Sequence, residues 1–224
     1  MEKKKLYIYA SISFAITSIL IYFLLKGKDG LKALARKEST NYEKSSYRGL
    51  IVSTPNNNTS FDVLIVFGGI SYANPEWMYK QLPREVLLNN LVFIAPYTEA
   101  LSSVKDKVAS YMDENGFKEV SLSLVGFSAG GLNIQSGYSI NLKFFGLIDP
   151  STKSEYAKIN YGKNAHMVYN NDNWGAYPNI KSLQPKIAKN IENGGGMTEE
   201  VKMAHADIPK YFFSSHSKYL RRKG

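Results

Sequence analysis

The segment 120–131 constrains the fold most, because a strand-like apolar run leads without a break into a serine flanked by glycines. The alternation Val-Ser-Leu-Ser-Leu-Val predicts a β-strand, and a Gly-x-Ser-x-Gly frame centred on Ser128 follows at once. This order is typical of a nucleophile elbow, a sharp strand-to-helix turn that exposes a serine hydroxyl. Gly126 and Gly130 suit that turn because a side chain at either position would obstruct it. The pattern therefore predicts that Ser128 is a nucleophile.

Apolar runs of strand length recur on both sides of this motif. They cover residues 48–53, 62–67, 91–95, 144–148 and 166–169. Between 101 and 115 the apolar residues recur at helical spacing, Asn115-Gly116 predicts the end of that helix, and 181–191 is also predicted to be helical. This alternation predicts an α/β fold, with helices flanking a mostly parallel sheet of about six strands that begins with an antiparallel strand at 48–53.

In open parallel sheets, the loops after the carboxyl ends of the strands collect the functional residues. The strand at 62–67 runs into Gly68-Gly69-Ile70. We expect the backbone N–H groups of Gly69 or Ile70, together with that of Ala129, to stabilise a developing oxyanion.

Two later strands are each followed by a carboxylate. Asp172 follows the strand at 166–169, and Asp149 follows the strand at 144–148. Either carboxylate is placed to orient a histidine and to stabilise the imidazolium that forms when a serine loses its proton. We favour Asp172 as this acid, and Asp149 is the competing candidate.

The chain has only three histidines, which narrows the choice of a general base. His166 begins a predicted strand and so lies at the wrong edge of the sheet, while His216 stands in a polar, basic segment that favours a solvated surface position. His205 follows the glycine-rich stretch 193–196 and precedes a helical segment predicted to begin near Pro209. His205 is therefore the favoured base.

The chain order Ser128, Asp172, His205 resembles that of the α/β-hydrolase superfamily, and the resemblance covers about residues 48–220. It implies that Ser128 attacks an acyl carbonyl, that His205 accepts and returns the proton, and that Asp172 holds the imidazole tautomer. The implied function is a carboxylester hydrolase of esterase or lipase type that forms an acyl-enzyme intermediate. The sequence departs from the family at Phe67, where many esterases carry histidine, and it leaves no room for a cap domain.

Alternatives to ester hydrolysis remain open at this stage. An acyltransferase or a thioesterase would use the same triad, and a non-catalytic binding module could retain the same scaffold. The sequence does not indicate the acyl group, the alcohol or the oligomeric state. An ester or lipid is the expected substrate class.

Composition excludes several other chemistries. The chain has no cysteine, no cluster of His, Asp and Glu with metal-ligand spacing, and no phosphate-binding loop or dinucleotide fingerprint, so we expect no metal and no cofactor. The net charge is +9, and the first 47 residues contribute nine basic against four acidic side chains. Positive charge next to an apolar segment favours an anionic lipid surface rather than nucleic acid as a partner.

The apolar segment 6–25 is 20 residues long and carries no charge. At about 1.5 Å per residue it is long enough to cross a bilayer, and it predicts a transmembrane helix or signal anchor rather than a cleaved signal peptide. The expected organisation is a membrane anchor at 1–27, a basic tether at 28–47 and a catalytic domain at 48–224. Lysines flank both ends of the span, so the side of the membrane that holds the catalytic domain stays open.

Overall fold

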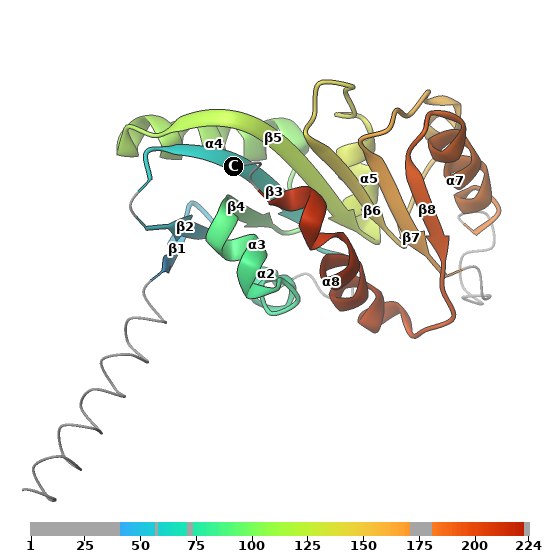
Figure 1. The fold of residues 1–224 in the computed structure, drawn as a ribbon, viewed down its shortest axis with the longest axis horizontal. Helices are drawn as coiled ribbons and strands as arrows, with labels where there is room; N and C mark the ends of the chain where they lie inside the picture. The colour runs from blue at the N-terminus through green and yellow to red at the C-terminus, as the bar shows by residue number, and fades with distance from the viewer. Residues whose placement is uncertain (1–40, 57, 71–73, 171–180, 222–224) are drawn as a thin grey trace, which may run out of the picture. The chain divides into compact units, whose positions relative to one another are not determined.

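The computed structural model describes residues 41–56, 58–70, 74–170 and 181–221 (Figure 1). The predicted anchor at 6–25 and most of the predicted tether at 28–47 lie outside these residues. Of the helices in the described ranges, none combines the length and the apolar character that a membrane span requires.

An eight-stranded sheet forms the centre of the fold, in the order β1-β2-β4-β3-β5-β6-β7-β8 (Figure 1). The strands are β1 (Tyr42–Tyr47), β2 (Leu50–Pro55), β3 (Ser60–Phe67), β4 (Asn90–Ala95), β5 (Lys118–Phe127), β6 (Phe144–Ile148), β7 (Ala165–Tyr169) and β8 (Met197–Glu200). β1 pairs antiparallel with β2, and β2 pairs antiparallel with β4. All other neighbouring strands are parallel, so the predicted mostly parallel sheet is confirmed.

The sheet has eight strands where about six were expected. The two outermost strands were not predicted because their sequences lack an apolar pattern. β1 lies within the segment predicted as tether, and the sheet therefore begins six residues before position 48. β8 has the sequence Met-Thr-Glu-Glu and contains no fully buried side chain. Edge strands pair on one side only and can be polar, so burial leaves little trace of them in the sequence.

Helices cover both faces of the sheet. They are α2 (Pro75–Tyr79), α3 (Arg84–Asn89), α4 (Leu101–Asn115), α5 (Ala129–Gln135), α7 (Gln184–Asn193) and α8 (Ile208–Leu220), with the short 3-10 segments η2 (Tyr156–Lys158) and η3 (His205–Asp207). Successive side chains of β3 point to opposite faces: Val63 and Ile65 pack in one core with α4, α5 and α7, and Leu64 packs in the other with α2, α3 and α8. Between β6 and β7, only η2 interrupts the loop.

Helix α8 buries His216, which corrects the predicted surface position of this histidine. The side chain of His216 is 5% exposed, and its ring stacks on Phe212 with centroids 4.5 Å apart. Phe212 precedes His216 by one helical turn, so both side chains lie on the face of α8 that packs against the sheet. Of the polar residues around His216, Ser214, Ser215 and Lys218 are exposed, and Ser217 is buried.

Candidate active site

The turn after β5 has the backbone geometry of a nucleophile elbow. Ser128 lies between the end of β5 and the start of α5, with φ of 52° and ψ of −120°. This conformation is uncommon for a residue that carries a side chain. The N–H of Ser128 donates to the carbonyl of Ile148 at 2.9 Å, and the N–H of Ser151 donates to the carbonyl of Ser128 at 2.8 Å. The elbow is therefore fixed to the chain on both sides of the end of β6.

Close packing explains why glycine flanks the serine. A Cβ atom on Gly126 would lie 2.5 Å from the carbonyl oxygen of Gly130. A Cβ atom on Gly130 would lie 2.4 Å from the carbonyl oxygen of Gly68. Both neighbours are backbone atoms that cannot rotate away, so any larger residue would displace α5 or the loop after β3.

The glycine loop after β3 lies directly against the serine. A Cβ atom on Gly69 would lie 2.8 Å from Cβ of Ser128. In the part of the chain that the structure describes, turn and loop hydrogen bonds engage the N–H of Gly68 but not those of Gly69, Ile70 or Ala129. The structure thus brings Gly69 and Ala129 next to Ser128, while the side chain of Ile70 is 58% exposed.

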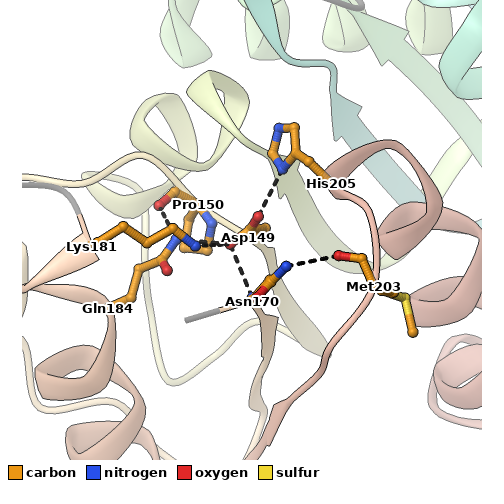
Figure 2. Close-up of polar contacts among 7 residues, drawn as sticks. All are labelled: Asp149, Pro150, Asn170, Lys181, Gln184, Met203 and His205. Carbon is orange, nitrogen blue, oxygen red and sulfur yellow. Dashed lines mark hydrogen bonds and ion pairs between the residues drawn. The ribbon is translucent and has the colours of Figure 1, made fainter. Parts of the chain in front are cut away.

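His205 pairs with Asp149, the competing acid of the sequence analysis (Figure 2). Nδ1 of His205 and Oδ2 of Asp149 are 2.7 Å apart. Asp149 directly follows β6, adopts a φ of 41°, and is fully buried. A buried carboxylate at this distance fixes the imidazole tautomer with its proton on Nδ1.

Three further groups hold the other oxygen of Asp149, as Figure 2 shows. Oδ1 accepts hydrogen bonds from Nε2 of Gln184 at 3.0 Å and from the backbone N–H of Asn170 at 3.2 Å. Nζ of Lys181, a side chain that is only 9% exposed, lies 3.6 Å from the same oxygen. The carboxylate is therefore held on both oxygens.

Asn170 also ties the acid to the segment that carries the histidine. Its side-chain Nδ2 donates to the carbonyl of Met203 at 2.7 Å (Figure 2). The backbone N–H of Asn170 also binds Asp149. This one residue, directly after β7, therefore positions both the carboxylate and the chain segment that leads to His205. This link joins residues that are more than 30 positions apart in the sequence.

The ring of His205 lies beside the elbow. Its centroid is 4.5 Å from that of Phe127, the residue before Ser128, and its second nitrogen points away from Asp149 (Figure 2). The contacts of the described residues include no hydrogen bond between Ser128 and His205. Such bonds are often long in enzymes without substrate and shorten when substrate binds.

The structure therefore brings most, but not all, of the predicted site residues together. Ser128, Asp149, His205 and the glycine loop share the carboxyl edge of the sheet, whereas Asp172 lies outside the described residues. Sequence reasoning missed Gln184 and Lys181, which reach Asp149 from a segment more than 30 residues away. The position of Asn170, directly after the predicted strand at 166–169, was a weak indication in the sequence that it belongs to the site. Among the described residues, no group of three or more His, Asp or Glu side chains is arranged to hold a metal ion.

No protein-family description and no curated protein matches the sequence. Solved structures do match the fold. The S-formylglutathione hydrolase from Agrobacterium tumefaciens has a TM-score of 0.57 at 10% identity, covering 80% of this chain and 93% of that one. The esterase from Pyrobaculum calidifontis has a TM-score of 0.54 at 12% identity, covering 80% and 84%. The esterase domain of a Rhodothermus marinus protein has a TM-score of 0.53 at 7% identity, covering 80% and 99%. These structures share a backbone arrangement with this chain, and on that basis the chain has the α/β-hydrolase fold.

Proposed function

We propose that the chain is a serine hydrolase that cleaves carboxylic esters, with Ser128 as nucleophile, His205 as general base and Asp149 as the acid that orients it. One observation carries the proposal: His205 is hydrogen-bonded at 2.7 Å to a fully buried carboxylate, and its ring packs beside the elbow that holds Ser128. Asp172, the acid favoured from the sequence, is the competing assignment. The geometry favours Asp149.

The acylation step follows from this arrangement. Oγ of Ser128 attacks the ester carbonyl carbon while its proton passes to Nε2 of His205, and Asp149 stabilises the resulting imidazolium through Nδ1. The tetrahedral intermediate then expels the alcohol, which takes the proton from Nε2. An acyl group remains bound to Ser128.

Deacylation repeats the same proton transfers with water. His205 removes a proton from the attacking water. When the second tetrahedral intermediate collapses and releases the carboxylic acid, His205 returns the proton to Oγ of Ser128. In both steps the N–H groups of Gly69 or Ile70 and of Ala129 would bind the oxyanion. Each such donor contributes about 3 to 4 kcal/mol in other hydrolases.

The comparisons support ester hydrolysis as the reaction class. The similar structures from Pyrobaculum calidifontis and Rhodothermus marinus are described as an esterase and an esterase domain, and that from Agrobacterium tumefaciens as an S-formylglutathione hydrolase. Because the site residues of this chain fit the same chemistry, we extend the activity to it as part of the proposal.

The direct test is active-site labelling. We expect a fluorophosphonate probe to modify Ser128 in the full chain, as located by mass spectrometry, because only an activated serine reacts rapidly. Ser128→Ala should remove the adduct and His205→Gln should slow it strongly. Ser136→Ala, which changes an exposed serine just after α5, is the matched control and should label normally.

Hydrolysis of p-nitrophenyl esters of increasing acyl length then defines the substrate. Release of p-nitrophenol with transfer of the acyl group to an added alcohol would favour the acyltransferase alternative. A folded protein that neither labels nor hydrolyses esters would contradict the enzyme assignment and favour a binding module.

We further propose that residues 6–25 anchor this activity to a membrane. The support is the length and lack of charge of that segment. The full chain should remain with membranes after alkaline carbonate extraction, and a chain of residues 28–224 should be released. A truncated chain that stays with the membrane would place the anchor elsewhere.

A further inference from the structure

A second cavity lies at the opposite edge of the sheet from Ser128. It has a volume of about 360 Å³ and opens where β6 and β7 begin and α8 ends. The residues that line it include Lys143, Lys163, His166, Lys218, Tyr219 and Arg221. The proposed reaction uses none of them.

The cavity has more positive than negative charge. Two of its four cationic side chains are paired with carboxylates: Lys143 with Asp62 at 2.7 Å, and Arg221 with Glu85 at 3.8 Å. Within the described residues, no carboxylate lies at ion-pair distance from Lys163 or Lys218. Among the residues that the structure describes, two positive charges at the cavity are therefore uncompensated.

A buried histidine adds a hydrogen-bonding group to this cavity. His166 lines it while being only 3% exposed, and Nδ1 of His166 has no hydrogen-bond partner among the described residues. Burial, together with the charges of His216 and Lys218, lowers the pKa of His166 to about 4. A backbone contact with Lys163 partly opposes that lowering. The neutral ring can donate one N–H.

The neighbouring His216 is not among the residues that line the cavity, and one of its two ring nitrogens is already engaged. Nδ1 of His216 lies 3.1 Å from the carbonyl oxygen of Phe212 and 2.9 Å from Oγ of Ser215. His216 contacts His166 edge to face, with ring centroids 5.3 Å apart. This ring contact helps to hold the His166 ring in place.

We propose that this cavity binds a phosphate group. Lys163 and Lys218 would supply two charges and His166 a buried hydrogen-bond donor, and the ring of Tyr219 would form an apolar wall beside the ligand. A phosphate monoester carries about −1.5 to −2 charges at neutral pH and so matches two uncompensated cations, whereas a carboxylate would leave one unpaired.

The C-terminal end of α8 opposes this binding with a partial negative charge. Two groups offset it. Nζ of Lys143 donates to the carbonyl oxygen of Arg221 at 3.0 Å, and Lys218 itself stands in the last turn of α8. The local field at the cavity thus remains favourable for an anion.

Isothermal titration calorimetry with inorganic phosphate tests the site, using the full chain in a neutral detergent and chloride to hold the ionic strength constant. We expect saturable binding to the wild type and at least tenfold weaker binding to the double variant Lys163→Gln and Lys218→Gln. The matched control is Lys186→Gln with Lys189→Gln, which makes the same charge change on the exposed face of α7. It should bind phosphate as the wild type does.

A second variant separates a built site from diffuse surface attraction. His166→Phe keeps both lysines and removes only the buried donor, so it should also weaken binding. Absence of saturable binding, equal weakening in the α7 control, or unchanged binding in His166→Phe would each overturn the proposal.

Short-chain ligands identify the source of the phosphate. Tighter binding of dihexanoyl phosphatidic acid than of inorganic phosphate would show that the Tyr219 wall contacts a lipid and would assign the site to a lipid headgroup. Equal binding of the two would assign it to a free phosphate. Fluorophosphonate labelling at Ser128 does not depend on this cavity, so the two proposals fail separately.

Discussion

The two ends of β6 and β7 place histidines in opposite electrostatic settings. At the carboxyl edge, His205 is hydrogen-bonded to the buried carboxylate of Asp149. At the amino edge, His166 is buried beside His216 and lines a cavity that is rich in lysine. A histidine side chain is thus paired with a negative charge at the carboxyl edge, and another histidine is surrounded by positive charge at the amino edge.

This difference shows that burial alone does not prepare a histidine for acid–base catalysis. A general base must accept a proton, and a nearby carboxylate stabilises the imidazolium that results. His205 has such a partner. Burial without one keeps His166 neutral, since burial lowers its pKa to about 4. The amino edge therefore suits hydrogen bonding to an anion, and the carboxyl edge suits proton transfer.

The largest expected effect separates the histidines of the two edges. His205→Gln should lower kcat for ester hydrolysis by roughly 10⁶-fold, because loss of the base in a comparable triad costs about that much. His216→Gln, at the amino edge, should keep kcat within about threefold, since the general base and its acid are intact. Steady-state kinetics on samples shown to be folded by circular dichroism would measure both, and similar losses in the two variants would break the comparison.

The identity of the acid is the next most sensitive point. Asp149→Asn should lower kcat by about 10⁴-fold, because an amide cannot hold the productive tautomer of His205. Asp207→Asn changes an exposed carboxylate within η3, two residues after His205, and serves as the control. A loss of kcat of about 10⁴-fold in Asp172→Asn would instead assign the acid to Asp172, the residue favoured from the sequence.

At the amino edge, we expect His166 to make the free energy of unfolding depend on pH. The pKa of His166 is about 4 in the folded chain and about 6.5 when unfolded, so below pH 6.5 the unfolded state binds a proton that the folded state does not. Stability should therefore fall as pH drops from about 6.5 to about 4, by up to roughly 3 kcal/mol. His216, whose pKa is also lowered by burial, adds to the loss in the same direction.

Urea unfolding at pH 7 and near the lower limit of this range would measure the change. His166→Gln removes the titrating ring and should make the loss distinctly smaller. A loss as large in the variant as in the wild type would assign the pH dependence to other groups.

The smallest effect concerns the support of Asp149. Gln184→Leu removes one hydrogen bond to the carboxylate, and it should lower kcat about tenfold with little change in KM because hydrogen bonds to charged groups contribute roughly 1.5 to 3 kcal/mol. Gln135→Leu is the matched control: Gln135 is also buried, and its Nε2 donates to the carbonyl groups of Gly131 and Ser151. Equal losses of kcat in both variants would indicate general destabilisation rather than loss of positioning.

Local patterns in the sequence were sufficient for much of the fold. The predicted strand at 144–148 coincides with β6, and the predicted helix at 101–115 coincides with α4 and ends at Gly116 with φ of 66°. The elbow was also evident, because its steric demands fall on Gly126 and Gly130 within two residues of Ser128. Apolar periodicity and turn sterics act over a few residues, so one chain segment carries the whole signal.

The tertiary structure decided which distant groups meet. Asp149 and Asp172 both follow predicted strands, and only the packed sheet places Asp149 at 2.7 Å from a histidine 56 positions later. The burial of His216 likewise depends on which face of α8 meets the sheet. The sequence by itself determined six of the eight sheet-forming segments, the elbow and His205 as a candidate base. Pairing across the fold was decided by assembly, because a hydrogen bond between separated residues depends on how the intervening elements pack.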